Sequence, residues 1–278
     1  MKLGILCGVR PSDTQLNSTC SVMHFLKFSK GNAKLSKRLI FNLPAGHTCP
    51  NAGVCRTMAD PDTGKIQDAP RTDNALGNEF RCFAAMAETR PAVRAARWHN
   101  FNAIKDTIFE AQHDPVQAVT DTIALAIWGM QSVDNPYKLC RIHESGDFFS
   151  FTYFLAWLQV AREHREITFY AYTKQLAYWL IAYQSGEIPD NFYLTASMGG
   201  DEDYLLDQHP DVFRRVAVVV YTEEEAAQLG FEIDHDDSHC FGNKPFALLV
   251  HNNQRKGSDA AKALAARRRQ GSWTGYSH

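Results

Sequence analysis

The sequence has no long uncharged hydrophobic run. Its longest apolar pattern with helical spacing, residues 116–133, is interrupted by Asp121, so we expect a packed amphipathic helix there rather than a membrane span. Residues 1–11 contain no apolar stretch of the length found in signal peptides. These absences predict a cytoplasmic protein that has no membrane as a partner.

An excess of charge of either sign is also missing. The 278 residues include 29 Lys and Arg against 31 Asp and Glu, a net charge of -2, which gives no overall attraction to nucleic acid or anionic membranes. Hydrophobic residues make up 45% of the chain, which argues against a disordered or fibrous protein. We expect a single α/β domain over 1–278, with an irregular N-terminal extension (1–36) and a basic C-terminal helix and tail (257–278).

Two common catalytic motifs are absent. The Gly199-Gly200 pair lacks the flanking pattern and the lysine of a phosphate-binding P-loop, and no nucleophile elbow of the Gly-x-Ser-x-Gly type occurs. Seven cysteines are an odd number spread over a long chain, unlike the disulfide framework of a small secreted protein. In a reducing cytoplasm, grouped cysteines more often bind metal or react than form disulfides.

Short apolar runs alternate with helical patterns from residue 38 onward. The run 215–221 fits a strand that is buried on both faces of a parallel sheet. Strands that alternate with helices imply right-handed crossovers and one parallel sheet, either open or curled into a partial barrel. Strands are expected at 38–43, 139–143, 167–172, 192–197, 215–221 and 246–251, and helices from 91 and 115 and at 151–163, 175–183, 202–208, 223–229 and 260–269.

Three cysteines share one polar segment after the first predicted strand. Cys49, Cys55 and Cys82 have the spacing Cys-x5-Cys-x26-Cys. Residues 47–88 show little apolar periodicity, so a segment this long needs a functional or metal-based reason to be ordered. We interpret the cysteines as ligands of an iron–sulfur cluster or of tetrahedral zinc. The alternative is that they are small buried hydrophobic residues.

The fourth ligand is less well defined. Cys240 lies in a polar loop just before the last predicted strand. Such a loop normally lies at the opposite edge of a parallel sheet from the loops that follow strands, so Cys240 reaches the other cysteines only if its loop folds over. His47 and His239 flank candidate ligands and could replace one. The cysteines expected to be bystanders are Cys7, Cys20 and Cys140, the last inside a predicted strand.

Polar side chains follow most of the predicted strands. The carboxyl ends of parallel strands meet at one edge of a sheet, where α/β proteins place their sites, so we predict a shared polar pocket there. The catalytic candidates are His143, Glu144, Asp147 and Lys174, and the cofactor-binding candidates are Ser145, Gly146, Tyr172, Ser197 and His251.

Each candidate also has an ordinary structural interpretation. Ser145 or Asp147 can cap the following helix. His143 or His251 can be a hydrogen-bonded structural histidine rather than a proton shuttle or a ligand. Lys174 can begin a helix in solvent rather than neutralise a phosphate or carboxylate. Polar residues follow several strands, and this repetition favours a shared pocket over separate structural roles.

Four blocks of the sequence resemble the gene-product-eighty-eight family of phage proteins. The blocks are Phe28–Leu35, Leu43–Pro50, Arg141–Phe148 and Tyr170–Lys174, and the resemblance covers about residues 25–255. The family is encoded largely by mycobacteriophages and other actinobacterial phages, and its function is uncharacterised. The resemblance implies a phage protein in the host cytoplasm. Members often carry several cysteines before the last strand, where this chain has only Cys240.

The layout also resembles the core of radical S-adenosylmethionine (SAM) enzymes. Those enzymes place a cysteine loop after the first strand of a partial barrel and a SAM-binding Gly/Glu-rich motif after the second, where this chain has Glu144–Asp147. The resemblance implies a partial (β/α)6 TIM-like barrel of parallel strands. The chain departs from that family because the Cys-x3-Cys-x2-Cys spacing is absent, and a cluster with four cysteine ligands leaves no iron open for SAM.

Three functions remain open, and whether the protein is an enzyme is open with them. The first is an iron–sulfur protein whose cluster, expected to be [4Fe-4S], is structural, redox-active or catalytic and is held by Cys49, Cys55, Cys82 and Cys240. The second is a radical SAM enzyme proper, with three of these cysteines on the cluster and Glu144, Asp147 and Ser197 around SAM. The third is a zinc-stapled module that binds nucleic acid or protein, touching phosphates and bases through Arg267–Arg269, Trp273 and Tyr276. The partner is an unidentified small molecule or a macromolecule of host or phage.

Overall fold

The computed structural model describes residues 25–31, 35, 37–55, 57–68 and 80–272. Its main feature is a seven-stranded sheet in the order β1-β2-β5-β6-β7-β8-β9. β1 is antiparallel to β2, and all other neighbours are parallel, which confirms the predicted α/β class. The strands are β1 (Phe28–Ser29), β2 (Leu39–Phe41), β5 (Leu139–Ile142), β6 (Thr168–Thr173), β7 (Phe192–Ser197), β8 (Val216–Val220) and β9 (Phe246–Leu249).

The helices begin and end near the positions that the sequence predicts. Asp114, Ser150 and Thr222 cap the starts of α2, α3 and α6 by accepting backbone N–H groups, and Gly230 ends α6 in the left-handed conformation. The remaining strands, β3 (Met58–Ala59) and β4 (Ile66–Gln67), form a separate hairpin. The helices are α1 (Pro91–Glu110), α2 (Pro115–Met130), α3 (Phe151–Glu163), α4 (Leu176–Gln184), α5 (Tyr204–Gln208), α6 (Glu223–Leu229) and α7 (Asp259–Gln270), with 3₁₀ turns η1 (Ala85–Thr89) and η2 (Ser238–Phe241).

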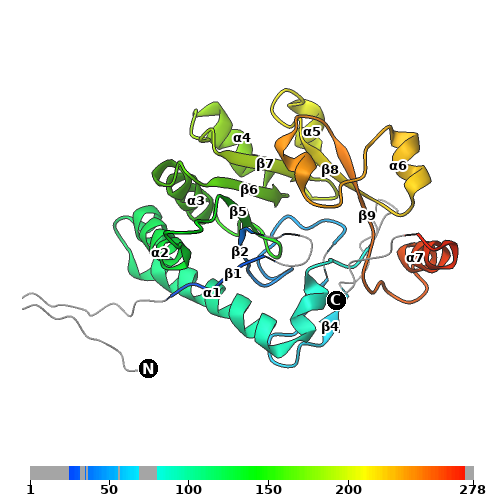
Figure 1. Ribbon diagram of the computed structural model, residues 1–278, viewed down its shortest axis with the longest axis horizontal. Coiled ribbons are helices and arrows are strands. Elements are labelled where there is room, and N and C mark those ends of the chain that lie inside the picture. The colour runs from blue at the N-terminus through cyan, green and yellow to red at the C-terminus, as the bar shows by residue number, and fades with distance from the viewer. Residues whose placement is uncertain (1–24, 32–34, 36, 56, 69–79, 273–278) are drawn as a thin grey trace, which may run out of the picture.

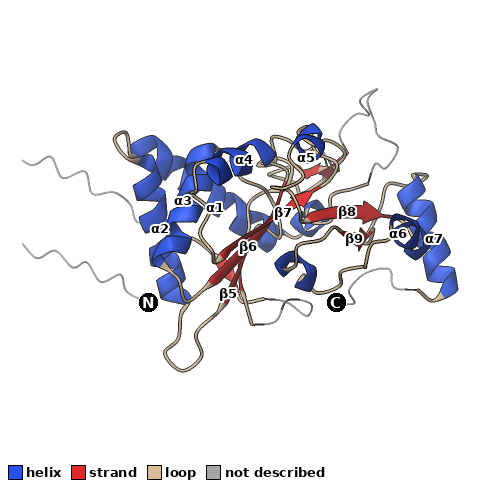
Figure 2. Ribbon diagram, turned by 90° about the horizontal axis from the view of Figure 1, so that it is seen from above, coloured by secondary structure: helices blue, strands red, loops and turns tan. Residues whose placement is uncertain are grey.

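The parallel strands stand in the sheet in the order in which they occur in the chain. Right-handed crossovers between successive neighbours therefore place the connecting helices on one face. Figure 1 shows α2, α3, α4 and α5 along this outer side, and Figure 2 shows the twist from β5 through β7 to β8. The opposite, inner face is left for the long loops.

Strand alternation divides the side chains between the two faces. Phe41, Ile142 and Phe169 point outward into the main core, where Trp157 of α3 is fully buried against them. Smaller apolar clusters cover β8 and β9, one with α6 and one with α7. The expectation that residues 215–221 are buried on both faces was wrong, because three of the five residues of β8 are only half-buried.

The inner face carries an interlinked polar group. Arg141 Nη1 forms an ion pair with Asp237 Oδ2 at 2.5 Å, and Tyr170 Oη donates to the same carboxylate oxygen at 3.1 Å. Arg38 Nη1 donates to Tyr170 Oη at 2.6 Å. These contacts hold the segment that contains η2 against the sheet.

The sheet is open. β1 and β9 lie at its two edges, and no pairing among the described strands joins them, so the structure shows a mostly parallel sheet and not a closed barrel. In the N-terminal extension, β1 pairs with β2, while residues 1–24, 32–34 and 36, with Cys7 and Cys20, lie outside the described residues. No helix in the described part of the chain is long and apolar enough to cross a membrane.

Candidate functional site

Residues 44–55, which we call the cysteine loop, follow β2 and cross the carboxyl ends of neighbouring strands. After β6, Gln175 Oε1 accepts a hydrogen bond from Asn51 Nδ2 at 2.9 Å. After β7, Gly199 O accepts one from Val54 N at 2.9 Å. The loop that carries Cys49 and Cys55 is therefore fixed to the edge where strand-end polar residues meet.

Ser145 and Gly146 bring the end of β5 against the cysteine loop. Ser145 Oγ donates to Leu43 O at 2.9 Å. Gly146 has a φ of +89°, and a Cβ added there would lie 2.6 Å from Thr48 Oγ1 and 2.7 Å from Leu43 Cβ. The contacts of these two cofactor-binding candidates position the loop that carries the thiols.

Cys49, Cys55 and Cys82 lie within electrostatic reach of one another. Burial raises the pKa of Cys49 well above its ordinary value, and the charges of Asp147, Cys82 and Cys55 raise it further. Burial likewise raises the pKa of Cys82 to about 11, with a further contribution from Cys55. All three are free thiols. The structure thus gathers three thiols beside one buried carboxylate.

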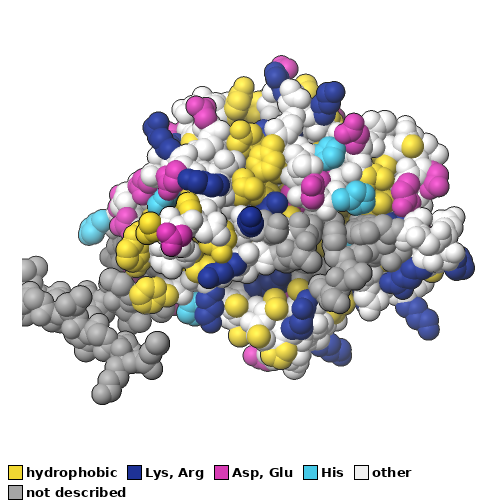
Figure 3. All heavy atoms as spheres, viewed as in Figure 1, with side chains coloured by type: hydrophobic (Ala, Val, Ile, Leu, Met, Phe, Trp, Pro, Cys, Tyr) yellow, Lys and Arg dark blue, Asp and Glu magenta, His cyan; other side chains and the backbone are white. Residues whose placement is uncertain are grey.

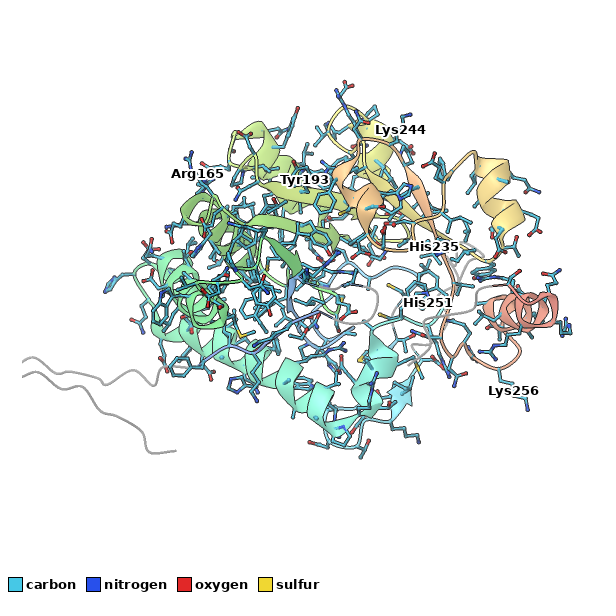
Figure 4. The ribbon with its side chains drawn as sticks, in the orientation of Figure 1. Arg165, Tyr193, His235, Lys244, His251 and Lys256 are labelled. Atoms are coloured by element: carbon cyan, nitrogen blue, oxygen red, sulfur yellow. The ribbon has the colours of Figure 1, made fainter. Side chains whose placement is uncertain are left out.

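Cys82 reaches this edge because the segment 81–83 is bound to residues that follow β9. Gln254 Oε1 accepts a hydrogen bond from Arg81 N at 2.7 Å, and Gln254 Nε2 donates to Arg81 O at 3.4 Å. The ring of His251, labelled at the end of β9 in Figure 4, lies 3.9 Å from that of Phe83, centroid to centroid. His251 therefore contacts the neighbour of Cys82.

Asp147 ties the end of β5 to the end of β6. Its Oδ1 accepts from Thr173 Oγ1 at 2.6 Å, and its Oδ2 accepts from Lys174 N at 2.8 Å. Burial raises the pKa of Asp147 to about 6, against the opposing effect of these hydrogen bonds. Two of its acceptor positions therefore serve the strand ends, and its charge acts on Cys49.

Lys174 and Ser197 join the end of β6 to the end of β7. Lys174 Nζ donates to Ser197 O and to Met198 O, both at 2.7 Å. The lysine side chain is buried, and Ser197 is half-buried. Lys174 is thus a buried cation beside the cysteine loop rather than a solvated helix start.

His143 points away from the thiols. Its Nε2 lies 2.8 Å from Tyr153 Oη, and its ring packs against Phe148 in the core beneath α3. Burial lowers the pKa of His143 to about 3, and Arg141 lowers it further, so the imidazole stays neutral near pH 7. Glu144, the next residue, is half-buried. The structure brings Asp147, Lys174 and Ser197 to the cysteine loop but places His143 on the other side of the sheet.

Cys240 lies over the inner face, together with Tyr172. Its carbonyl accepts a hydrogen bond from Arg215 Nη1 at 2.9 Å, and the adjacent Phe241 packs on Tyr170 and Tyr193. Burial raises the pKa of Cys240, and Asp237 raises it further. Tyr172 Oη lies 3.4 Å from Asp234 Oδ2. The loop before β9 does fold over the sheet, but it carries Cys240 to the middle of the inner face rather than to the carboxyl edge.

The two histidines that flank candidate ligands have partners of their own. His47 Nε2 lies 2.9 Å from Ala59 O, in the β3–β4 hairpin. His239 is 3.0 Å from Glu232 and 3.4 Å from Asp234.

Comparison with known proteins decides the family. The chain matches the family described as "Gene product 88" over residues 26–271. The chain belongs to the gene product 88 family. Its curated relatives include the "Gene 88 protein" of Mycobacterium phage D29 and that of Mycobacterium phage L5, each 35% identical over 94 residues. The match covers 34% of this chain and 38% of each relative, so the chain spans less than half the length of either relative. No solved structure matches.

The family assignment confirms the predicted phage family for this gene product 88 chain. It also accounts for the four sequence blocks, since residues 28–174 lie within the matched region. Three of the blocks correspond to parts of the site: the cysteine loop after β2, the turn after β5 and the end of β6.

Sequence reasoning missed a buried ion pair next to the cysteine loop. Glu88 Oε1 accepts from Ala45 N at 2.8 Å and from Arg97 Nη1 at 2.9 Å. A signal was present in α1, because Arg94 and Arg97 fall on the same helical stripe as the buried Ile104. Charged residues on a buried stripe need partners, and that requirement could have pointed to this position.

The described residues contain no group of three or more His, Cys, Asp or Glu side chains arranged so that it could hold a metal ion. The three thiols of the gene product 88 chain are neighbours without forming such a set.

Proposed function

We propose that this gene product 88 protein binds an iron–sulfur cluster, of the [4Fe-4S] type, through Cys49, Cys55 and Cys82 in the host cytoplasm. The observation that carries the proposal is the convergence of three half-buried, mutually interacting thiols from distant positions in the chain. Cysteines that act only as small hydrophobic residues do not need to meet beside a carboxylate and a lysine. Thiolate ligation would link the described parts of this polar segment to one another.

A cluster and a single zinc ion require different spacings of the thiols. Zinc–sulfur bonds of about 2.3 Å in a tetrahedron bring the sulfur atoms to about 3.8 Å from one another. The thiolates of a cluster bind different iron atoms and stand further apart. The metal and sulfide content measured below separates these two sites.

A cluster that is bound by three cysteines rather than four would favour the radical SAM alternative. Cys240 faces Asp237, Arg141, Asp234 and Arg215 on the inner face, which leaves Cys49, Cys55 and Cys82 as the proposed ligands. A cluster held by three cysteines would have one iron free to bind SAM and would supply the electron for its reductive cleavage. The sequential strand order is also that of a partial (β/α)6 barrel, which is the architecture we propose for this sheet.

Residues at the ends of β5, β6 and β7 would surround such a site. Asp147 holds the ends of β5 and β6 together, and Lys174 holds the end of β7 through two carbonyls. Glu144 and Ser197 are half-buried at the same edge and are the groups proposed to contact SAM. Tyr172 and Arg141 line the inner face below. A substrate would therefore enter over the carboxyl edge.

The test is anaerobic purification followed by measurement of iron, sulfide, zinc and visible absorption. We expect about four irons and four sulfides per chain, lost in Cys49→Ser, Cys55→Ser and Cys82→Ser. Cys240→Ser and Cys140→Ser are the controls, because each replaces a thiol outside the proposed ligand set, buried in both cases, and both should keep the cluster. A colourless protein with one zinc would contradict the proposal. Loss of the cluster in Cys240→Ser would restore four-cysteine ligation.

The binding and cleavage of SAM are tested by a separate measurement. SAM added to the reduced protein should change its electron paramagnetic resonance spectrum and yield 5′-deoxyadenosine and methionine in equal amounts. A spectrum that SAM leaves unchanged would refute the radical SAM role and leave a structural or redox cluster.

Nucleic-acid binding is a second candidate, carried by the surface of α7. Arg268 and Arg269 of α7 are exposed, as are Arg255 and Lys256 just before it, and dark blue side chains gather over α7 in Figure 3. Buried Arg267 anchors the helix by donating to Val250 O at 2.9 Å. Trp273 and Tyr276, also predicted to contact bases, lie outside the described residues.

A gel shift tests this candidate. Replacing Lys256, Arg268 and Arg269 by Gln should weaken binding to DNA or RNA and reduce its salt dependence. Replacing Lys105, Arg165 and Lys244 by Gln removes the same charge elsewhere; Figure 4 shows Arg165 and Lys244 far from Lys256. Equal effects of the two triple variants would contradict a site on α7.

A further inference from the structure

A cavity opens at the amino edge of the sheet, the opposite edge from the cysteine loop. Arg215 and Asn243 come shortly before β8 and β9, and these strands are parallel neighbours, so both residues lie where the strands begin. The cavity has a volume of about 310 Å³, near the lower end of the roughly 300–1,000 Å³ of small-molecule sites. Its size therefore suits a small ligand. It is lined by Tyr183, Asp211, Val212, Arg214, Arg215 and Asn243.

Arg215 brings a positive charge to this cavity. It is half-buried, its Nη1 donates to Cys240 O at 2.9 Å, and its guanidinium lies 5.3 Å from the ring centre of Tyr193, which Figure 4 labels on β7. Its Nε is buried without a hydrogen-bond partner. Burial lowers the pKa of Arg215, because removal from water disfavours the charged form. No carboxylate in the described part of the chain forms an ion pair with it.

Other arginines of the chain have the partners that Arg215 lacks. Arg81, Arg97 and Arg141 each form an ion pair with a carboxylate, at 2.7, 2.9 and 2.5 Å. Arg94 donates to three backbone carbonyls, whereas Arg215 donates to one. Charged groups that are removed from water are normally paired. Arg215 therefore has charge and hydrogen-bonding capacity left for an anion from outside the chain.

The other residues of the cavity indicate which kind of anion fits. Arg214 adds a second guanidinium, and its Nε donates to Asp211 O at 3.0 Å. Two guanidinium groups suit a phosphate, whose oxygens accept several N–H groups at once. The Asp211 carboxylate only accepts hydrogen bonds, so it suits a hydroxyl and not a phosphate. Tyr183 presents an exposed ring. A ligand that carries both a phosphate and hydroxyls matches this set.

We propose that the cavity binds a small hydroxylated phosphate monoester, with Arg214 and Arg215 on the phosphate and Asp211 on a hydroxyl. This chemistry is shared by sugar phosphates and mononucleotides. A phosphate beside the two guanidinium groups would supply the counter-charge that Arg215 lacks. The inference goes beyond the proposed function and does not depend on it, because no residue of the cavity belongs to the cysteine loop or to the strand ends that contact it.

Isothermal titration calorimetry of the full chain tests the site, with ribose 5-phosphate, AMP, ribose and inorganic phosphate as probes in a phosphate-free buffer of low ionic strength. Ribose 5-phosphate and AMP should bind, and ribose and inorganic phosphate should bind about tenfold more weakly, because each lacks one half of the recognised chemistry. Arg215→Gln and Arg214→Gln should each weaken the binding of ribose 5-phosphate about tenfold. Asp211→Ala should narrow the difference in affinity between ribose 5-phosphate and inorganic phosphate.

The ring of Tyr183 distinguishes the two kinds of phosphate monoester. Tighter binding of AMP than of ribose 5-phosphate, with the difference lost in Tyr183→Ala, identifies a mononucleotide whose base packs on the ring. Equal affinities identify a sugar phosphate.

Arg162→Gln is the matched control, because Arg162 is also half-buried but pairs with Glu187 and lies outside the cavity. It should keep the wild-type affinity. The inference is overturned if neither ribose 5-phosphate nor AMP binds the wild-type protein, or if Arg162→Gln weakens binding as much as Arg215→Gln. If Arg215→Gln fails to fold, Arg214→Gln at an exposed position decides: an unchanged affinity contradicts the site.

Discussion

Gly146 and Gly186 both have positive φ angles, +89° and +67°, but only Gly146 is crowded. Gly146→Ala should lower the free energy of unfolding by about 3 kcal/mol, because the new methyl group meets Thr48 and Leu43 in addition to the left-handed strain. Gly186→Ala, with nothing within 4 Å, should cost about 1 kcal/mol. Urea denaturation of both variants measures the difference, and equal losses would contradict the close approach at Gly146.

Burial of His143 makes the free energy of unfolding fall as the pH is lowered. Its pKa is about 3 in the folded protein against about 6.5 when unfolded, so the unfolded chain binds the proton first as pH falls. Its contribution is fully present above pH 6.5 and is lost toward pH 3. Between pH 7 and pH 5 the loss is about 2 kcal/mol.

The variant His143→Asn tests this, because Asn tolerates the positive φ of 68° at that position. Its free energy of unfolding should fall less than that of the wild type between pH 7 and pH 5. His113→Asn, a change at an exposed histidine, should leave the wild-type pH dependence in place. Parallel profiles for all three proteins would contradict the lowered pKa of His143 in the folded state.

At the scale of elements, the carboxyl edge depends on how segment 81–83 is held by Gln254. Gln254→Ala should remove both hydrogen bonds to Arg81 and reduce iron bound per chain at least twofold, because Cys82 is no longer held at the edge. Gln131 is the matched control: it bonds the backbone N–H and C=O of Tyr137 in the same way, near the end of α2. Gln131→Ala should cost similar stability, about 1–3 kcal/mol, and leave iron content unchanged.

Much of the element pattern could be predicted from local sequence. The helix over 151–163 and the strand over 192–197 match the structure residue for residue, because apolar periodicity and an N-cap Ser150 act locally. The placement of Cys49 and Cys55 followed from the general rule that loops after parallel strands share one edge.

The features that the sequence did not predict depend on contacts between residues that are distant in the chain. Cys240 sits on the inner face because Asp237 pairs with Arg141, a partner 96 residues earlier, and no local pattern encodes that. His143 looks like a strand-end catalytic residue in the sequence, yet its positive φ turns the ring into the core. Arg97 was overlooked because a charged residue in a helix is ordinarily exposed.

At the scale of the whole molecule, the apolar packing is unequal along the sheet. β5 and β6 contribute to the main core under α1–α4, whereas β8 and β9 are covered by two small clusters. Backbone amides in β8 and β9 should therefore exchange with solvent at least tenfold faster than those in β5 and β6. Hydrogen–deuterium exchange read by mass spectrometry measures this. Uniform protection across the sheet would show that it opens only as one unit.

The two hydrogen bonds between Arg81 and Gln254 span 173 residues of chain, and this separation sets an order of events during synthesis. Because each parallel strand adds beside the one before it, the growing chain can extend its sheet as it leaves the ribosome. The three thiols emerge early, but the residue that fixes the segment of Cys82 emerges much later, 173 residues after Arg81. The ribosome must therefore synthesise the chain through Gln254 before the third thiol is locked in place. If the proposed cluster binds, delivery of iron and sulfide would therefore follow the synthesis of Gln254.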